Sequence, residues 1–135
     1  MSRPRRYLPL NRRGLLGAAL VTMLAAPFPA LAHHGWSWAE GEQMELKGTI
    51  QKVSMAPPHP TLSVKAADGV VWRIELANPS QTERSGFTAN SAKPGDAVVI
   101  LGNRDKDRSQ AHMKAVRVTV NGKTYDIYPE RIGTQ

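Results

Sequence analysis

The sequence predicts an all-β protein with one short helix, folded as a small OB-fold-like Greek-key barrel of five to six strands. Two observations carry this prediction. Short segments alternate apolar with polar residues, which is the pattern of half-buried strands. A helix-start signal lies between the third and fourth segments, and three strands, a helix and two strands is the element order of the OB-fold. A β-sandwich is the main alternative, and the position of the helix favours the barrel.

Residues 1–32 predict a cleavable signal peptide. A basic start without acidic residues is followed by an apolar stretch that is too short to span a bilayer, and Ala30-Leu31-Ala32 fits a cleavage site. An uncleaved membrane anchor is the alternative. Arg12-Arg13 resembles a twin-arginine signal, and ordinary Sec export fits as well. We therefore expect a periplasmic protein without a stable membrane span, whose mature chain begins at His33.

Most of the net positive charge of the chain belongs to this predicted signal segment. A net charge of +7 suits nucleic-acid or anionic-membrane binding. Five of the 18 Lys and Arg residues and none of the 11 Asp and Glu residues lie in the signal segment, so the mature chain carries a net charge of +2. No basic stripe with interleaved aromatics follows, and we expect no nucleic-acid partner.

The absence of cysteine excludes disulfides, thiolate metal ligands and a cysteine nucleophile.

The first element of the mature chain is an arm. Residues 33–43 lack a clear periodicity, which leaves residues 44–135 for the barrel domain. The first strand is expected over residues 44–50, where apolar residues share one face. Gly48 in the middle of this strand indicates a bulge or a sharp bend. The prolines of residues 55–60 then predict a rigid loop.

The next two strands continue the meander. They are expected over residues 61–66 and 70–76, joined by the hairpin signal Asp68-Gly69. Alternation along the second of them places Trp72 toward the core and Glu75 toward solvent.

The predicted helix follows at once. Asn78 suits the N-cap, Pro79 suits the first turn, and Gln81 can complete a capping box. Gly86 is expected to end the helix after about two turns.

Two more strands and a terminal hairpin complete the domain. Residues 97–101 predict a buried strand, and residues 102–110 predict a charged, solvated loop. The next strand is expected over residues 113–120, and Asn121-Gly122 is a type I′ hairpin signal leading to residues 123–128.

The histidines are the strongest candidates for chemistry. Cleavage after Ala32 would give His33 a free α-amino group beside its imidazole, an arrangement that resembles the histidine brace of exported copper proteins. His34 or His59 would supply the second imidazole, and prolines hold His59 on a stiff backbone. Tetragonal nitrogen ligation suits Cu(II) or Ni(II), and copper binds most tightly among the divalent metals. His112 precedes a core strand and is a weaker candidate; a solvated terminus is the alternative for the first pair.

The sequence offers little for catalysis. It contains no nucleophile elbow, Walker motif or dinucleotide-binding glycine motif, and the glutamates near the arm lack the spacing of an acid–base pair. Trp36 and Trp38 either shield a site or pack the arm onto the barrel, and packing is favoured. Met44, Met55 and Met113 could offer thioethers to Cu(I), but they form no Met-rich cluster.

Several short segments carry a family resemblance: Ala32-His33-His34, Leu46–Ile50, Pro58-His59 with Thr61–Val64, Trp72 with Ile74-Glu75-Leu76, Arg84–Thr88, Lys93–Asp96 and Gly102-Asn103-Arg104. With them, the mature chain resembles an exported bacterial family of unknown function (domain of unknown function 6152). The resemblance implies a periplasmic, single-domain β protein with a signal peptide and no established activity. The chain departs from the family at Pro57, where Asn is commoner, and at Gly35-Trp36, where Ser or Ala and then Phe are usual.

These observations favour a periplasmic protein that binds copper, as Cu(II), through His33, His34 and His59. Its role would be copper carriage, buffering or delivery to an envelope protein partner. The alternative is a metal-independent envelope binding module of OB-fold type. Nothing predicts an enzyme, although redox chemistry at a brace-type copper stays open, and the oligomeric state is not predicted.

Overall fold

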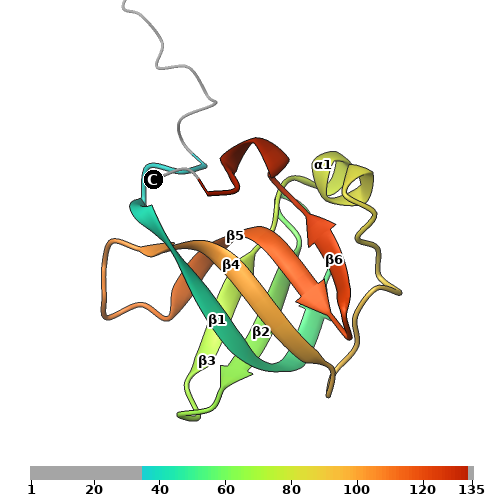
Figure 1. The fold of residues 1–135 in the computed structure, drawn as a ribbon, viewed down its shortest axis with the longest axis horizontal. Helices are drawn as coiled ribbons and strands as arrows, with labels where there is room; N and C mark the ends of the chain where they lie inside the picture. Colours follow the sequence, from blue (N-terminus) through green and yellow to red (C-terminus); the bar gives the residue numbers. More distant parts are fainter. Residues whose placement is uncertain (1–34, 134–135) are drawn as a thin grey trace, which may run out of the picture.

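The computed structural model describes residues 35–133, so the predicted signal peptide, His33 and His34 lie outside the described residues. The described part contains six strands, one α-helix and a short 3-10 helix (Figure 1). In chain order they are β1 (Ala39–Ser54), β2 (Thr61–Ala66), β3 (Val71–Glu75), α1 (Pro79–Arg84), β4 (Ala97–Asp105), β5 (His112–Val120), β6 (Lys123–Asp126) and η2 (Pro129–Arg131). No helix of residues 35–133 is long and apolar enough to cross a membrane.

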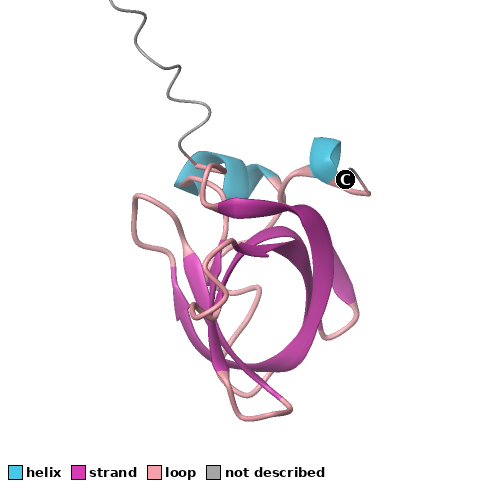
Figure 2. Cartoon of the chain, turned by 90° about the vertical axis from the view of Figure 1, so that its left-hand side faces the viewer, coloured by secondary structure: helices cyan, strands magenta, loops and turns pink. Residues whose placement is uncertain are grey.

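The strands close into a barrel. Neighbouring strands follow the order β3-β2-β1-β4-β5-β6, and an additional parallel pairing joins β3 to β5. The ring therefore runs β1-β2-β3-β5-β4 and back to β1, and Figure 2 shows the strands curling around a common centre. β6 continues from β5 as a hairpin whose turn residues Asn121 and Gly122 have φ of 49° and 78°. These values confirm the type I′ turn, and the ring confirms the OB-fold-like barrel.

β1 begins earlier than the alternation predicts. The strand runs from Ala39, not from residue 44, because the register against β4 shifts between Ala39 and Gln43 and this irregularity interrupts the period of two. Gly48 lies where β1 pairs with β2 and β4 at once. A Cβ atom there would lie 2.4 Å from the carbonyl oxygen of Lys65, so only glycine allows this close approach.

β4 extends into the segment that was expected to be a solvated loop. Residues 102–105 continue the strand, and the expectation is wrong there because a register shift between Leu101 and Gly102 breaks the apolar run without ending the pairing. A Cβ atom on Gly102 would lie 2.1 Å from the carbonyl oxygen of Lys114. The glycine therefore lets β4 and β5 pass closely at the barrel rim.

The helix begins as predicted but is held differently. The Asn78 side chain accepts a hydrogen bond from the backbone N–H of Gln81 (2.9 Å), which confirms the N-cap. The Gln81 side chain instead donates to the carbonyl oxygen of Ile127 (3.1 Å), so the expected capping box is not formed. Gly86, with φ of 90°, follows the C-cap. The helix is thereby tied to the segment after β6.

The barrel interior is apolar, and it confirms the prediction of which side of the strands faces the core. Trp72 belongs to the core, as its parity predicts. Met113 is fully buried in the same core, and Met44 and Met55 pack against it, so all three methionines serve packing. The largest apolar side chains that are fully buried are Phe87, Ile50, Leu62, Ile74, Leu76, Ile100, Met113 and Ile127.

Candidate functional site

A cluster of charged side chains lies at one rim of the barrel, with Glu75 at its centre. Its Oε1 atom accepts a hydrogen bond from Lys114 Nζ (3.1 Å) and lies 3.8 Å from His59 Nε2, while its Oε2 atom lies 3.2 Å from His112 Nε2. Glu75 is 9% exposed and Lys114 is 1% exposed. We call His59, Glu75, Asp105, His112 and Lys114 the rim cluster.

Barrel closure brings these residues together. The parallel pairing of β3 with β5 places Arg73 beside His112 and Glu75 beside Lys114. The backbone N–H of Leu76 donates to the carbonyl oxygen of Pro60 (2.9 Å), which fixes the proline loop and its His59 against the end of β3. Three separate parts of the chain therefore meet at Glu75.

His112 lies between two carboxylates and under a tryptophan. Its Nδ1 atom lies 3.0 Å from Asp105 Oδ2, and its ring stacks on Trp38 with centroids 3.9 Å apart and an angle of 13°. The hydrogen bond from His112 lowers the pKa of Asp105. Both imidazole nitrogens are thus occupied by carboxylate oxygens, which makes His112 a residue that orients its neighbours.

The neighbours of Glu75 lower the pKa of its carboxyl group. Burial by itself would raise the pKa of Glu75, but the charge and hydrogen bond of Lys114, together with His112 and His59, lower it. Lys114 Nζ also lies 5.7 Å from the ring centroid of Trp36 and 5.8 Å from that of Tyr128. Burial, followed by the negative charge of Glu75, raises the pKa of Tyr128 to about 12. Glu75 is therefore an ionised carboxylate with a buried cation beside it.

The N-terminal arm packs onto this rim. Trp36 meets Tyr128 edge-on with centroids 4.9 Å apart, and the backbone N–H of Lys106 donates to the carbonyl oxygen of Trp38 (2.9 Å). A Cβ atom on Gly35, the first described residue, would lie 3.9 Å from Lys114 Nζ. Both tryptophans therefore pack the arm against the barrel, and the arm enters beside the Lys114–Glu75 pair.

The predicted site residues fall unevenly in the structure. His33 and His34 lie outside the described residues. His59 is part of the rim cluster: its side chain is 32% exposed, and its buried Nδ1 atom has no hydrogen-bond partner among residues 35–133. His112, a weaker candidate by sequence, is equally part of it. Within residues 35–133 no three His, Asp or Glu side chains are arranged to hold a metal ion by themselves.

Glu75, Asp105 and Lys114 were missed by sequence reasoning. Alternation assigns Glu75 to the solvent face of β3, and the sequence predicts a loop around Asp105. The face of β3 that carries Glu75 does point outward, but the arm and the proline loop cover it. The one available signal was the resemblance, which includes Ile74-Glu75-Leu76 without distinguishing the acid from its apolar neighbours.

A comparison with known protein families identifies the family of this chain. A protein family of unknown function (DUF6152) matches residues 20–114, which include His33, His34 and every residue of the rim cluster. The chain belongs to this family. The resemblance seen in the sequence is thereby confirmed, and the DUF6152 match ends at Lys114, inside β5. No curated protein matches the chain.

This DUF6152 protein is similar to proteins of known structure. One is the S. pombe Stn1-Ten1 complex, with a TM-score of 0.48 and 21% identity over 60% of this chain; the match spans 59% of that chain. Another is Rim1, a mitochondrial single-stranded DNA-binding protein from S. cerevisiae, with a TM-score of 0.45 and 12% identity over 61% of this chain and 95% of that one.

These matches correct the expectation of no nucleic-acid partner. The S. cerevisiae protein, to which this DUF6152 chain is similar, is by name a single-stranded DNA-binding protein. The exclusion was wrong because it rested on the charge balance of the mature chain and on the lack of a basic stripe, and neither property rules out such a partner.

Proposed function

We propose that this protein is exported to the periplasm and binds a transition-metal ion, Cu(II), where the N-terminal arm meets the rim cluster. The role would be carriage, buffering or delivery of copper to an envelope partner. One observation carries the proposal: Gly35, the first described residue of the arm, lies beside Lys114, and His59 lies beside Glu75, the hydrogen-bond partner of Lys114.

Short contacts connect the arm to His59. The Cβ position of Gly35 lies 3.9 Å from Lys114 Nζ, Lys114 Nζ lies 3.1 Å from Glu75 Oε1, and this oxygen lies 3.8 Å from His59 Nε2. His34 and His33 immediately precede Gly35, and consecutive Cα atoms are about 3.8 Å apart. The covalent chain therefore allows the amine and imidazole of His33 to reach a metal ion bound by His59.

The chemistry of the rim favours nitrogen ligands. Glu75 is already paired with Lys114, and both nitrogens of His112 are occupied by carboxylates, so neither residue is readily available to a metal. His59 has a buried Nδ1 atom without a partner in the described part of the chain. A site with one amine and two or three imidazoles suits Cu(II) better than Ca²⁺ or Mg²⁺, which prefer oxygen.

The test uses protein processed through its own signal, with the mature N-terminus checked by mass spectrometry. Cu(II) is titrated by calorimetry and followed by electron paramagnetic resonance, which reports nitrogen ligands. We expect His59→Ala and His33→Ala each to weaken binding by about tenfold or more. The matched control carries one extra N-terminal Met, which keeps every side chain but displaces the α-amine, and it should bind equally weakly.

Two results would overturn the proposal. One is weak, non-stoichiometric Cu(II) binding by the correctly processed protein. The other is tight binding that is unchanged in the two alanine variants and in the Met-extended protein, since the amine and His59 would then have no part in it.

A further inference from the structure

One outer face of the barrel gathers basic side chains from three strands. The pairing of β1, β2 and β3 places Lys52 opposite Ser63 and Ser63 opposite Arg73. In the neighbouring row, Lys65 of β2 lies opposite Val71 of β3. Paired strands lie about 4.8 Å apart, and alternate residues on one face of a strand lie about 6.8 Å apart. Lys52, Lys65 and Arg73 therefore form a compact group, which we call the basic face.

The charge of the basic face is not compensated within the described part of the chain. Lys52, Lys65 and Arg73 are all exposed, and their side chains form no hydrogen bond or ion pair among residues 35–133. Between them on the surface lies the half-buried Ser63, which carries no charge. The three cations are therefore open to an anionic partner from outside the protein.

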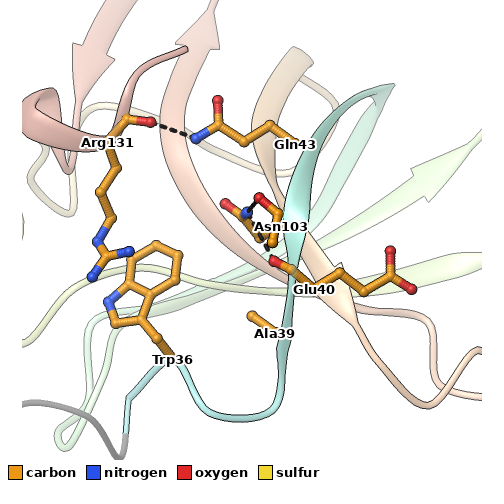
Figure 3. A pocket seen from close by; sticks show the side chains of 7 residues that line it. Trp36, Ala39, Glu40, Gln43, Asn103 and Arg131 are labelled. Atoms are coloured by element: carbon orange, nitrogen blue, oxygen red, sulfur yellow. Dashed lines mark hydrogen bonds between the residues drawn. The ribbon is translucent and has the colours of Figure 1, made fainter. Parts of the chain in front are cut away.

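The cations around the arm and η2 are arranged differently. The Arg108 guanidinium donates to the Glu40 carboxylate at 2.8 and 3.0 Å. The Arg131 guanidinium lies 4.0 Å from the ring centroid of Trp36, beside a cavity of about 290 Å³ (Figure 3). Both cations contact other parts of the protein, and this contrast singles out the basic face as a surface for a partner.

Two exposed valines extend the basic face to the tip of the β2–β3 hairpin. Val70 and Val71 are 42% and 53% exposed, and they are the exposed large apolar side chains of residues 35–133. Figure 1 shows this hairpin turn at the end of the barrel away from η2. Asp68 is the acidic residue of the turn, and its Oδ1 atom accepts a hydrogen bond from the backbone N–H of Val70 (2.9 Å). An apolar tip beside several cations suits the interface of an anionic bilayer.

A hollow of about 440 Å³ opens beside the basic face, between β1 and the end of β2. Lys47, Thr49 and Gln51 line it from β1, and Lys65 lines it from β2. These four side chains all carry hydrogen-bond donors, as a phosphate group requires. Glu45 lies 3.7 Å from Lys47 but does not line the hollow. The hollow therefore offers donors without a carboxylate among its described lining.

We propose that the basic face and the hairpin tip dock onto an anionic lipid bilayer. The cations meet the phosphate headgroups, the hollow between β1 and β2 receives one of them, and Val70 and Val71 enter the interfacial layer. The valines favour a bilayer over a dissolved polyanion, because a bilayer also removes apolar side chains from water. The surface uses none of the proposed copper ligands, so it stands or falls separately from the proposed function.

The test is sedimentation of the metal-free, processed protein with unilamellar vesicles. One type contains phosphatidylcholine with about one third phosphatidylglycerol, and the other contains phosphatidylcholine alone. The mature N-terminus is checked by mass spectrometry, because an uncleaved apolar signal segment would bind lipid by itself. We expect the protein to bind the anionic vesicles at least about tenfold more tightly than the neutral ones, and to be released as the salt concentration rises.

Matched variants separate the basic face from the net charge. Lys65→Gln combined with Arg73→Gln should weaken binding to the anionic vesicles about tenfold or more. The control combines Lys123→Gln on β6 with Arg84→Gln on α1, which removes the same two charges elsewhere and should weaken binding less than about twofold. Val71→Ser keeps every charge and should weaken binding about fivefold.

Three results would overturn the proposal. One is equal binding to the anionic and neutral vesicles. Another is an equal loss in the two double variants, since net charge alone would then explain binding. The third is full vesicle binding by Val71→Ser together with equally tight binding of a single-stranded oligonucleotide, because the face would then recognise a dissolved polyanion.

Discussion

Lys114 and Glu75 form a buried ion pair across the parallel β3–β5 pairing, with Nζ and Oε1 3.1 Å apart. Alternation assigns Glu75 to the solvent face of β3, whereas Lys114 has the parity of the inward-facing Val116, Val118 and Val120 of β5. The arm covers the ion pair, and Trp36 and Tyr128 place their rings near the ammonium group. The ion pair therefore links β3 to β5 where the barrel closes, next to the place where the arm packs onto the barrel.

Removing one partner of this pair should be costly. Lys114→Met leaves the Glu75 carboxylate buried without its cation, and we expect a loss of about 3–5 kcal/mol in the free energy of unfolding. The double variant Lys114→Met with Glu75→Gln should recover part of that loss, because no uncompensated charge remains. Urea unfolding followed by circular dichroism measures both. Losses that simply add would show that the two side chains do not interact.

Acid should destabilise the protein through two carboxylates of the rim cluster. The pKa of Glu75 is lowered from 4.5 by Lys114 and the histidines against the effect of burial, and that of Asp105 is lowered from 3.8 chiefly by His112. A lowered pKa means that the folded state binds protons less readily than the unfolded one. The stabilisation is therefore present above the ordinary pKa and lost as the pH falls through the lowered value.

The measurement is the urea midpoint between about pH 6 and pH 2. The wild-type midpoint should fall across the acidic part of this range. Glu75→Gln cannot titrate at this position, so its midpoint should fall less. An identical decline in the two proteins would mean that Glu75 does not supply the pH dependence.

Substitution by alanine should destabilise the protein at Gly102 but have little effect at Gly41. A Cβ atom on Gly102 would meet the Lys114 carbonyl oxygen at 2.1 Å, so Gly102→Ala must move backbone and should cost about 2 kcal/mol or more. A Cβ atom on Gly41 meets nothing within 4 Å, so Gly41→Ala should change stability by less than about 1 kcal/mol. Thermal unfolding of both variants decides this, and similar melting temperatures would contradict the close approach at Gly102.

The elements that could be predicted are those with local signals. The bounds of β2, the Asn78 cap and the Asn121-Gly122 turn follow from alternation and from backbone preferences of single residues. The start of β1 and the end of β4 could not be predicted, because register shifts at both places insert residues that break the period of two.

The sequence by itself determined the order of the strands along the chain, the place of the helix and the family. It also identified His59 as a candidate metal ligand. Only the tertiary structure decided that Glu75 and Lys114 are buried and that His59 and His112 meet at the same carboxylate. These residues come from separate parts of the chain: β3 meets His112 and Lys114 because it closes onto β5, and it meets His59 because the proline loop is hydrogen-bonded to the end of β3. Alternation tells which face a side chain takes, but it cannot tell whether a distant arm or loop covers that face.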